Sequence, residues 1–122
     1  MLAFLLAACA TSDGEASGLT GCADVVGVDV AGADGTYRFD VTVASPDTGW
    51  DKYADEWQVR SLDGAVFGTR ALAHPHVDEQ PFTRSLTAVA VPDGITEVEV
   101  AARDSVAGYC GATSIVNLPD RS

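Results

Sequence analysis

The sequence is poor in positive charge. Seven Lys and Arg residues stand against 18 Asp and Glu, and the formal net charge is -11 at pH 7. A surface of that sign repels phosphate backbones and anionic lipid headgroups. Nucleic acid is therefore excluded as a partner, and cations, basic proteins or basic peptides suit the surface better. The same acidity also keeps an exported protein soluble without any ligand.

Short motifs for catalysis or nucleotide binding are also missing. The chain has no GxSxG, no HExxH and no phosphate-binding P-loop. No sequence pattern identifies a serine that one of the two histidines would activate as a nucleophile. We therefore expect a non-catalytic protein.

The N-terminal apolar run, MLAFLLAAC, has no Lys or Arg before it. Its length is far below the ~20 residues that a membrane-spanning helix needs. It ends in Leu6-Ala7-Ala8-Cys9, with the small residues that a lipoprotein signal peptidase accepts before a cysteine. This pattern resembles a bacterial lipobox, and the resemblance implies that Cys9 is the first mature residue and carries a lipid. Residues 1–8 would be a truncated signal peptide; the alternative is a buried first strand that ends in cysteine.

Residues 9–21 have the Gly, Ser, Thr, Asp and Glu composition of a flexible tether. Together with the lipobox they predict an exported protein, bound to membrane lipid through Cys9 in the cell envelope. Ala10 stands where an Asp would follow the cysteine. The absence of Asp at this position resembles lipoproteins sent to the outer membrane, facing the periplasm, should the host be Gram-negative.

Three cysteines are present, and lipidation of Cys9 leaves Cys22 and Cys110 as a pair. Exported thiols usually oxidise, and no CxxC spacing favours a metal site. The sequence therefore predicts a disulfide between Cys22 and Cys110.

Apolar and polar residues alternate with a period of two through residues 22–122, which is typical of strands buried on one face. Turns rich in Asp and Gly separate these runs, and no segment has a helical period. We expect strands at 23–31, 36–44, 56–61, 66–71, 82–91, 97–104 and 113–118. This pattern predicts one all-β domain, a seven-stranded β-sandwich.

A tryptophan on the third strand, Trp57, and the alternating sixth strand in TEVEVAARDS carry a family resemblance. The domain resembles an immunoglobulin or fibronectin type III-like module on a bacterial lipoprotein. The segment HPHVDEQPFTRSL is similar to stretches of uncharacterised exported bacterial proteins. The resemblance implies a sandwich fold and no known activity.

In the fibronectin order, the connections 45–55, 74–81 and 105–111 emerge at one end of the sandwich. Exposed loop aromatics commonly anchor a partner. We therefore take Trp50, Tyr53 and Tyr109 as candidates for binding an envelope protein, peptide or glycan. In the alternative, these side chains pack over the end of the sandwich.

The segment 74–81 holds both histidines, His74 and His76, on either side of a proline. Histidines two apart in an extended segment project to the same side, so the pair could chelate copper, zinc or nickel. Asp78 or Glu79 would supply a third ligand. In the alternative, the histidines hydrogen-bond within the loop and both carboxylates face solvent. A divalent transition metal is the single cofactor that the sequence suggests.

Overall fold

The structure is a computed structural model that describes residues 21–121. Within that range the chain forms strands and turns, and none of its segments is a helix that could cross a membrane. The predicted signal peptide, Cys9 and residues 10–20 of the predicted tether lie outside the described residues.

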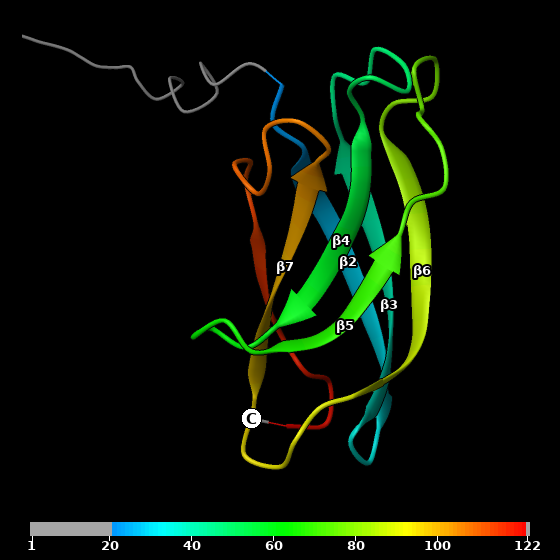
Figure 1. Ribbon diagram of the computed structural model, residues 1–122. Coiled ribbons are helices and arrows are strands. Elements are labelled where there is room, and N and C mark those ends of the chain that lie inside the picture. The colour runs from blue at the N-terminus through cyan, green and yellow to red at the C-terminus, as the bar shows by residue number, and fades with distance from the viewer. Residues whose placement is uncertain (1–20, 122) are drawn as a thin grey trace, which may run out of the picture.

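The strands lie in two antiparallel sheets that pack as two layers (Figure 1). One sheet has the order β2-β3-β6 and the other has the order β5-β4-β7-β8. The bounds are β2 Asp24–Ala33, β3 Thr36–Ala44, β4 Ala54–Arg60, β5 Val66–Ala71, β6 Phe82–Ala90, β7 Glu97–Asp104 and β8 Ser114–Asn117. The predicted all-β sandwich is confirmed.

The strands β3, β5 and β7 have the predicted bounds, β6 and β8 differ by one residue at one or both ends, and β2 and β4 differ by up to two residues. β2 continues to Ala33, which pairs with Thr36 across a two-residue turn. Asp34 and Gly35 in that turn have φ values of 58° and 85°. Two successive positive φ values give the tight hairpin turn whose twist matches the flanking strands, so pairing extends to the turn itself.

The core forms where the inner faces of the two sheets meet. The alternating residues of β3 are buried there, and Trp57 of β4 is fully buried among them. The core consists of Ala23, Val25, Tyr37, Phe39, Val41, Val43, Ala54, Trp57, Val59, Leu72, Phe82, Val89, Val91, Val98, Val100, Ala102 and Leu118. The period of two in the sequence therefore identified the inner faces of β3, β4 and β7, whereas in β2 a register shift between Val25 and Gly27 buries Val25 and exposes Val26.

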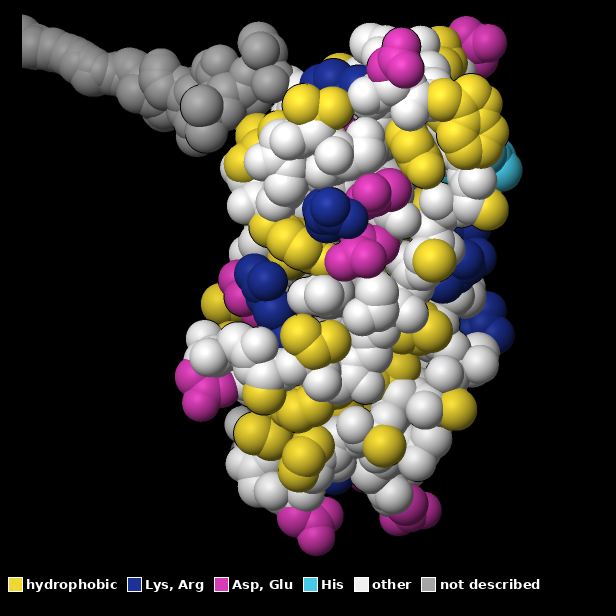
Figure 2. All heavy atoms as spheres, in the orientation of Figure 1, with side chains coloured by type: hydrophobic (Ala, Val, Ile, Leu, Met, Phe, Trp, Pro, Cys, Tyr) yellow, Lys and Arg dark blue, Asp and Glu magenta, His cyan; other side chains and the backbone are white. Residues whose placement is uncertain are grey.

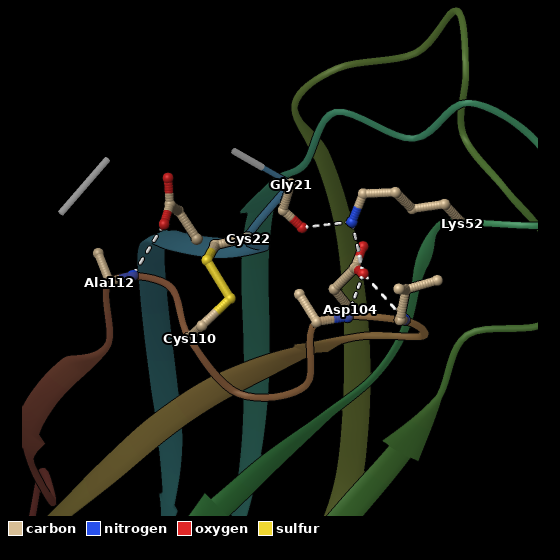
Figure 3. The surroundings of a disulfide bond; sticks show 9 residues. Gly21, Cys22, Lys52, Asp104, Cys110 and Ala112 are labelled. Carbon is tan, nitrogen blue, oxygen red and sulfur yellow. Dashed lines mark hydrogen bonds and ion pairs between the residues drawn. A yellow bond between two sulfur atoms is a disulfide. The ribbon is translucent and has the colours of Figure 1, made fainter. Parts of the chain in front are cut away.

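A disulfide joins Cys22 to Cys110, as predicted, with the two Cα atoms 5.4 Å apart (Figure 3). Beside it, the Lys52 ammonium donates to the carbonyl of Gly21 at 2.8 Å and to the Asp104 carboxylate at 2.6 Å. These contacts fix the start of the described chain against the loops that follow β3 and β7.

The loops after β3, β5 and β7 lie at the same end of the sandwich as the first described residues, at the top of Figure 1. The C-terminus lies at the opposite end. We call the end that carries these three loops the loop end. The predicted convergence of segments 45–55, 74–81 and 105–111 is therefore correct.

Replacing both Cys22 and Cys110 by serine should lower the free energy of unfolding by roughly 2–5 kcal/mol. The bond spans 88 residues of sequence, so its loss frees most of the unfolded domain. Urea denaturation of the oxidised protein, the reduced protein and the double variant measures the effect. The reduced protein should match the variant, and three equal midpoints would contradict a stabilising disulfide.

Candidate functional site

The Asp47 carboxylate is the central contact of the loop end. Asp47 is only 8% exposed. Its Oδ1 accepts hydrogen bonds from the Ser45 hydroxyl at 2.7 Å and from the Ala54 amide at 2.9 Å. Its Oδ2 accepts the amide hydrogen of His76 at 2.9 Å. One carboxylate thus joins the end of β3, the start of β4 and the segment 74–81, which holds both histidines and which we call the histidine segment.

Gln80 makes a second connection between the same loops. Its side-chain oxygen accepts from the Ser45 amide at 2.9 Å, and its side-chain nitrogen donates to the His76 carbonyl at 2.8 Å. Both backbone polar groups of His76 are therefore bonded to side chains. Pro81 follows Gln80, and β6 begins directly after it at Phe82, where we expected a strand to begin.

His76 is buried, with 4% of its surface exposed. Its ring stacks on Phe82 with the centroids 3.8 Å apart, and its Nε2 lies 2.8 Å from Nη2 of Arg84. Arginine only donates, so we assign Nε2 as the acceptor and place the ring hydrogen on Nδ1. Burial lowers the pKa of His76, and the charges of Arg84 and His74 lower it further. These effects favour the neutral form of the ring.

His74 is exposed, and its ring centroid lies 4.6 Å from that of His76. The two histidines are neighbours, as predicted. However, residues 21–121 contain no group of three His, Cys, Asp or Glu side chains that could hold a metal ion. Asp78 and Glu79 are exposed, and Glu79 lies 3.7 Å from Arg84. The predicted ligand set is thus not assembled around the histidine pair.

The predicted aromatic candidates divide into two groups. Trp50 is 68% exposed, and its ring contacts Tyr53 edge to face with the centroids 5.6 Å apart. Trp50 and residues 74–79 line an open groove of about 450 Å³. Figure 2 shows hydrophobic side chains beside a histidine near this end of the molecule. We call this feature the Trp50 groove.

Tyr109 is turned away from the groove. Its hydroxyl donates to the carboxylate of Glu56, and the guanidinium carbon of Arg60 lies 5.4 Å from its ring centroid. Glu56 and Arg60 flank the buried residues of β4, so they face outward. Burial raises the pKa of Tyr109, and the hydrogen bond to Glu56 raises it further. Tyr109 is therefore not part of the groove lining, and its side-chain partners lie on β4.

Sequence analysis missed the buried polar contacts that build this end. Asp104 is almost fully buried; burial raises its pKa, but the hydrogen bonds from Lys52 and from the amides of Ala107 and Val106 outweigh it, and the net pKa is lowered. Asp47 left one recognisable signal, because Ser and Asp just after a strand often bond to nearby backbone groups. Nothing in the sequence signalled its bond to His76.

One curated protein resembles the chain. The chain is 44% identical over 96 residues to a protein of the haloarchaeon Halomicrobium mukohataei that bears the name "Putative lipoprotein". The match covers 78% of this chain and 47% of that protein, so the chain spans about half the length of its relative. No family profile matches the chain, and no solved structure matches it.

The buried neutral His76 should make the stability of the protein depend on pH. Its pKa in the folded state is below the ordinary value of 6.5, so the unfolded chain binds the proton more tightly. The stability that His76 contributes is fully present above 6.5 and is lost as the pH falls toward the pKa of the folded state.

Urea denaturation between about pH 7 and pH 5 checks this dependence. The free energy of unfolding should fall more steeply with acidification in the wild-type protein than in His76→Gln. The exposed neighbour provides a comparison: His74→Gln removes one of the charges that lower the pKa of His76 but keeps its burial, so it should reduce the slope less than His76→Gln does. Equal slopes in all three proteins would refute the buried neutral assignment.

Proposed function

We propose that this chain is part of a lipid-anchored protein of the cell envelope, exported and attached to membrane lipid through Cys9. The observation that carries this proposal is the similarity to a protein named as a lipoprotein, which agrees with the Leu6-Ala7-Ala8-Cys9 pattern. That relative comes from an archaeon. A Gram-negative outer membrane has no support from it and is not part of the proposal.

The domain acts as a non-catalytic binding or structural module through the loop end. The exposed Trp50 beside an open groove supports recognition of an envelope protein, peptide or glycan. The groove lining contains no Ser, Thr, Cys or Lys side chain that a base could activate as a nucleophile. The exposed indole ring of Trp50 is the feature that favours a binding role.

The strand order supports a fibronectin type III-like type of sandwich. In the constant-type immunoglobulin order, the fourth strand lies in the sheet of the first, second and fifth strands. Here β5 pairs with β4 instead, in the sheet that also contains β7 and β8. We therefore prefer the fibronectin type III-like assignment within the wider resemblance.

A copper, zinc or nickel site at His74 and His76 stays a prediction as the alternative function. The neighbouring rings favour it. Against it, Arg84 already bonds to Nε2 of His76, so chelation through that atom requires the guanidinium to move. The binding role is the preferred proposal for this reason.

Cys9→Ser should release the protein from the membrane fraction and abolish incorporation of a labelled lipid precursor. The thioether to lipid requires the cysteine sulfur, and serine cannot replace it. Ala10→Ser keeps the cysteine and serves as the matched control. Continued labelling of Cys9→Ser would show that the anchor is elsewhere or does not exist.

A further inference from the structure

We propose that the Trp50 groove binds a basic peptide segment of a partner protein, with a Lys or Arg side chain of that segment seated against the Trp50 ring. The inference rests on the proposed binding function and specifies the chemistry of its partner. Three properties of the loop end support it: an exposed aromatic wall, uncompensated negative charge and fixed loop geometry.

Trp50 supplies the aromatic wall. It is 68% exposed, whereas the second tryptophan, Trp57, is fully buried in the core. The edge-to-face contact with Tyr53 supports the indole ring without covering it. Val77, also in the groove lining, is 51% exposed. An exposed indole face attracts a cation, and apolar neighbours suit the methylene stem of Lys or Arg.

Carboxylates supply the negative charge around this wall. Asp78 and Glu79 line the groove, and Asp51 follows Trp50 in the sequence. All three are exposed. Among the described residues, neither Asp51 nor Asp78 forms an ion pair. A cation that reaches the indole ring therefore also enters a negative field.

The basic residues of the protein are already engaged in internal contacts. Arg38, Lys52, Arg60, Arg84, Arg103 and Arg121 all form ion pairs with carboxylates of the same chain. Arg70 donates to the carbonyls of Ser85 and Ala71. The surplus of carboxylates is thus left for solvent or for a partner. Charge complementarity selects a basic partner and opposes an anionic lipid surface.

The loops that form the groove are fixed before any ligand arrives. The Asp47 carboxylate accepts from the amide of His76, and the Gln80 side chain donates to its carbonyl. Asp47 also accepts from the Ala54 amide, which closes the loop of residues 45–53 that carries Trp50. A fixed groove loses little conformational entropy on binding. Its volume of about 450 Å³ is within the usual range of ligand sites, roughly 300–1,000 Å³.

Fluorescence anisotropy of a labelled peptide of alternating Lys and Gly residues measures binding to the groove. A peptide of alternating Gln and Gly residues, equal in length, is the uncharged control. The protein is the full chain in a neutral detergent. We expect wild-type protein to bind the Lys peptide and not the Gln peptide. Trp50→Ala should weaken binding at least about tenfold, and Asp78→Asn should weaken it several-fold.

A matched charge control separates a local site from general acidity. Glu97→Gln removes the same unit of charge from an exposed position at the start of β7, and it should leave the affinity unchanged. Equal weakening by Glu97→Gln and Asp78→Asn, with no effect of Trp50→Ala, would overturn the inference. Unchanged urea midpoints for the variants show that folding is intact, and Asp78→Asn provides an independent test should Trp50→Ala unfold.

Two further outcomes would also overturn the basic-peptide assignment. One is the absence of Lys-peptide binding. The other is Trp50-dependent binding to vesicles of a zwitterionic lipid with no response to the peptide, which would make the groove a membrane contact. Neither result alters the Cys9 labelling test, so the proposed anchoring stands or fails separately.

Discussion

The buried carboxylate of Asp47 is the contact on which the loop end depends. Burying a carboxylate is unfavourable unless donors replace its water shell, and Asp47 receives donors from Ser45, Ala54 and His76. Hydrogen bonds to charged groups contribute about 1.5–3 kcal/mol each. Both ends of the connection between β3 and β4 thereby share one acceptor with His76, which lies 29 residues after Asp47 in the chain. Without the Asp47 carboxylate, only the hydrogen bonds of Gln80 with the Ser45 amide and the His76 carbonyl would join the connection 45–53 to the segment 74–81.

Charge pairing inside the domain explains the character of its surface. The few basic side chains form ion pairs with carboxylates of the same chain. Lys52, for example, pairs with Asp104 beside the disulfide. The amides of Val106 and Ala107 donate to the same Asp104 oxygen as Lys52 does, which concentrates three donors on Oδ2, whereas the buried Oδ1 has no partner among the described residues. Other carboxylates, such as Asp51 and Asp78, are exposed and form no ion pair among the described residues. The acidity of the chain therefore becomes a property of its exposed loops, where it can act on a partner.

Local rules accounted for most of the fold and less of the site. The period of two located the inner face of β3, because side chains alternate between the two faces of a strand and Tyr37 and its alternate neighbours face the other sheet. It did not locate the register shift in β2 that exposes Val26. The pair Cys22 and Cys110 followed from redox chemistry. The burial of His76 did not follow, because it depends on Phe82, Arg84 and a carboxylate 29 residues earlier. Long-range polar contacts of this kind leave no periodic signal, and the same is true of the bond that turns Tyr109 toward Glu56.

Amide hydrogen exchange in Asp47→Asn tests the central claim most directly. An asparagine side chain cannot accept from all three donors, because its amide group presents hydrogens where a carboxylate oxygen stood. Protection of the His76 amide should fall at least about tenfold relative to the amides of β4 and β7. Asp51→Asn, at an exposed position, should leave it unchanged. Retained protection of the His76 amide in Asp47→Asn would show that the loop end is held by something other than this carboxylate.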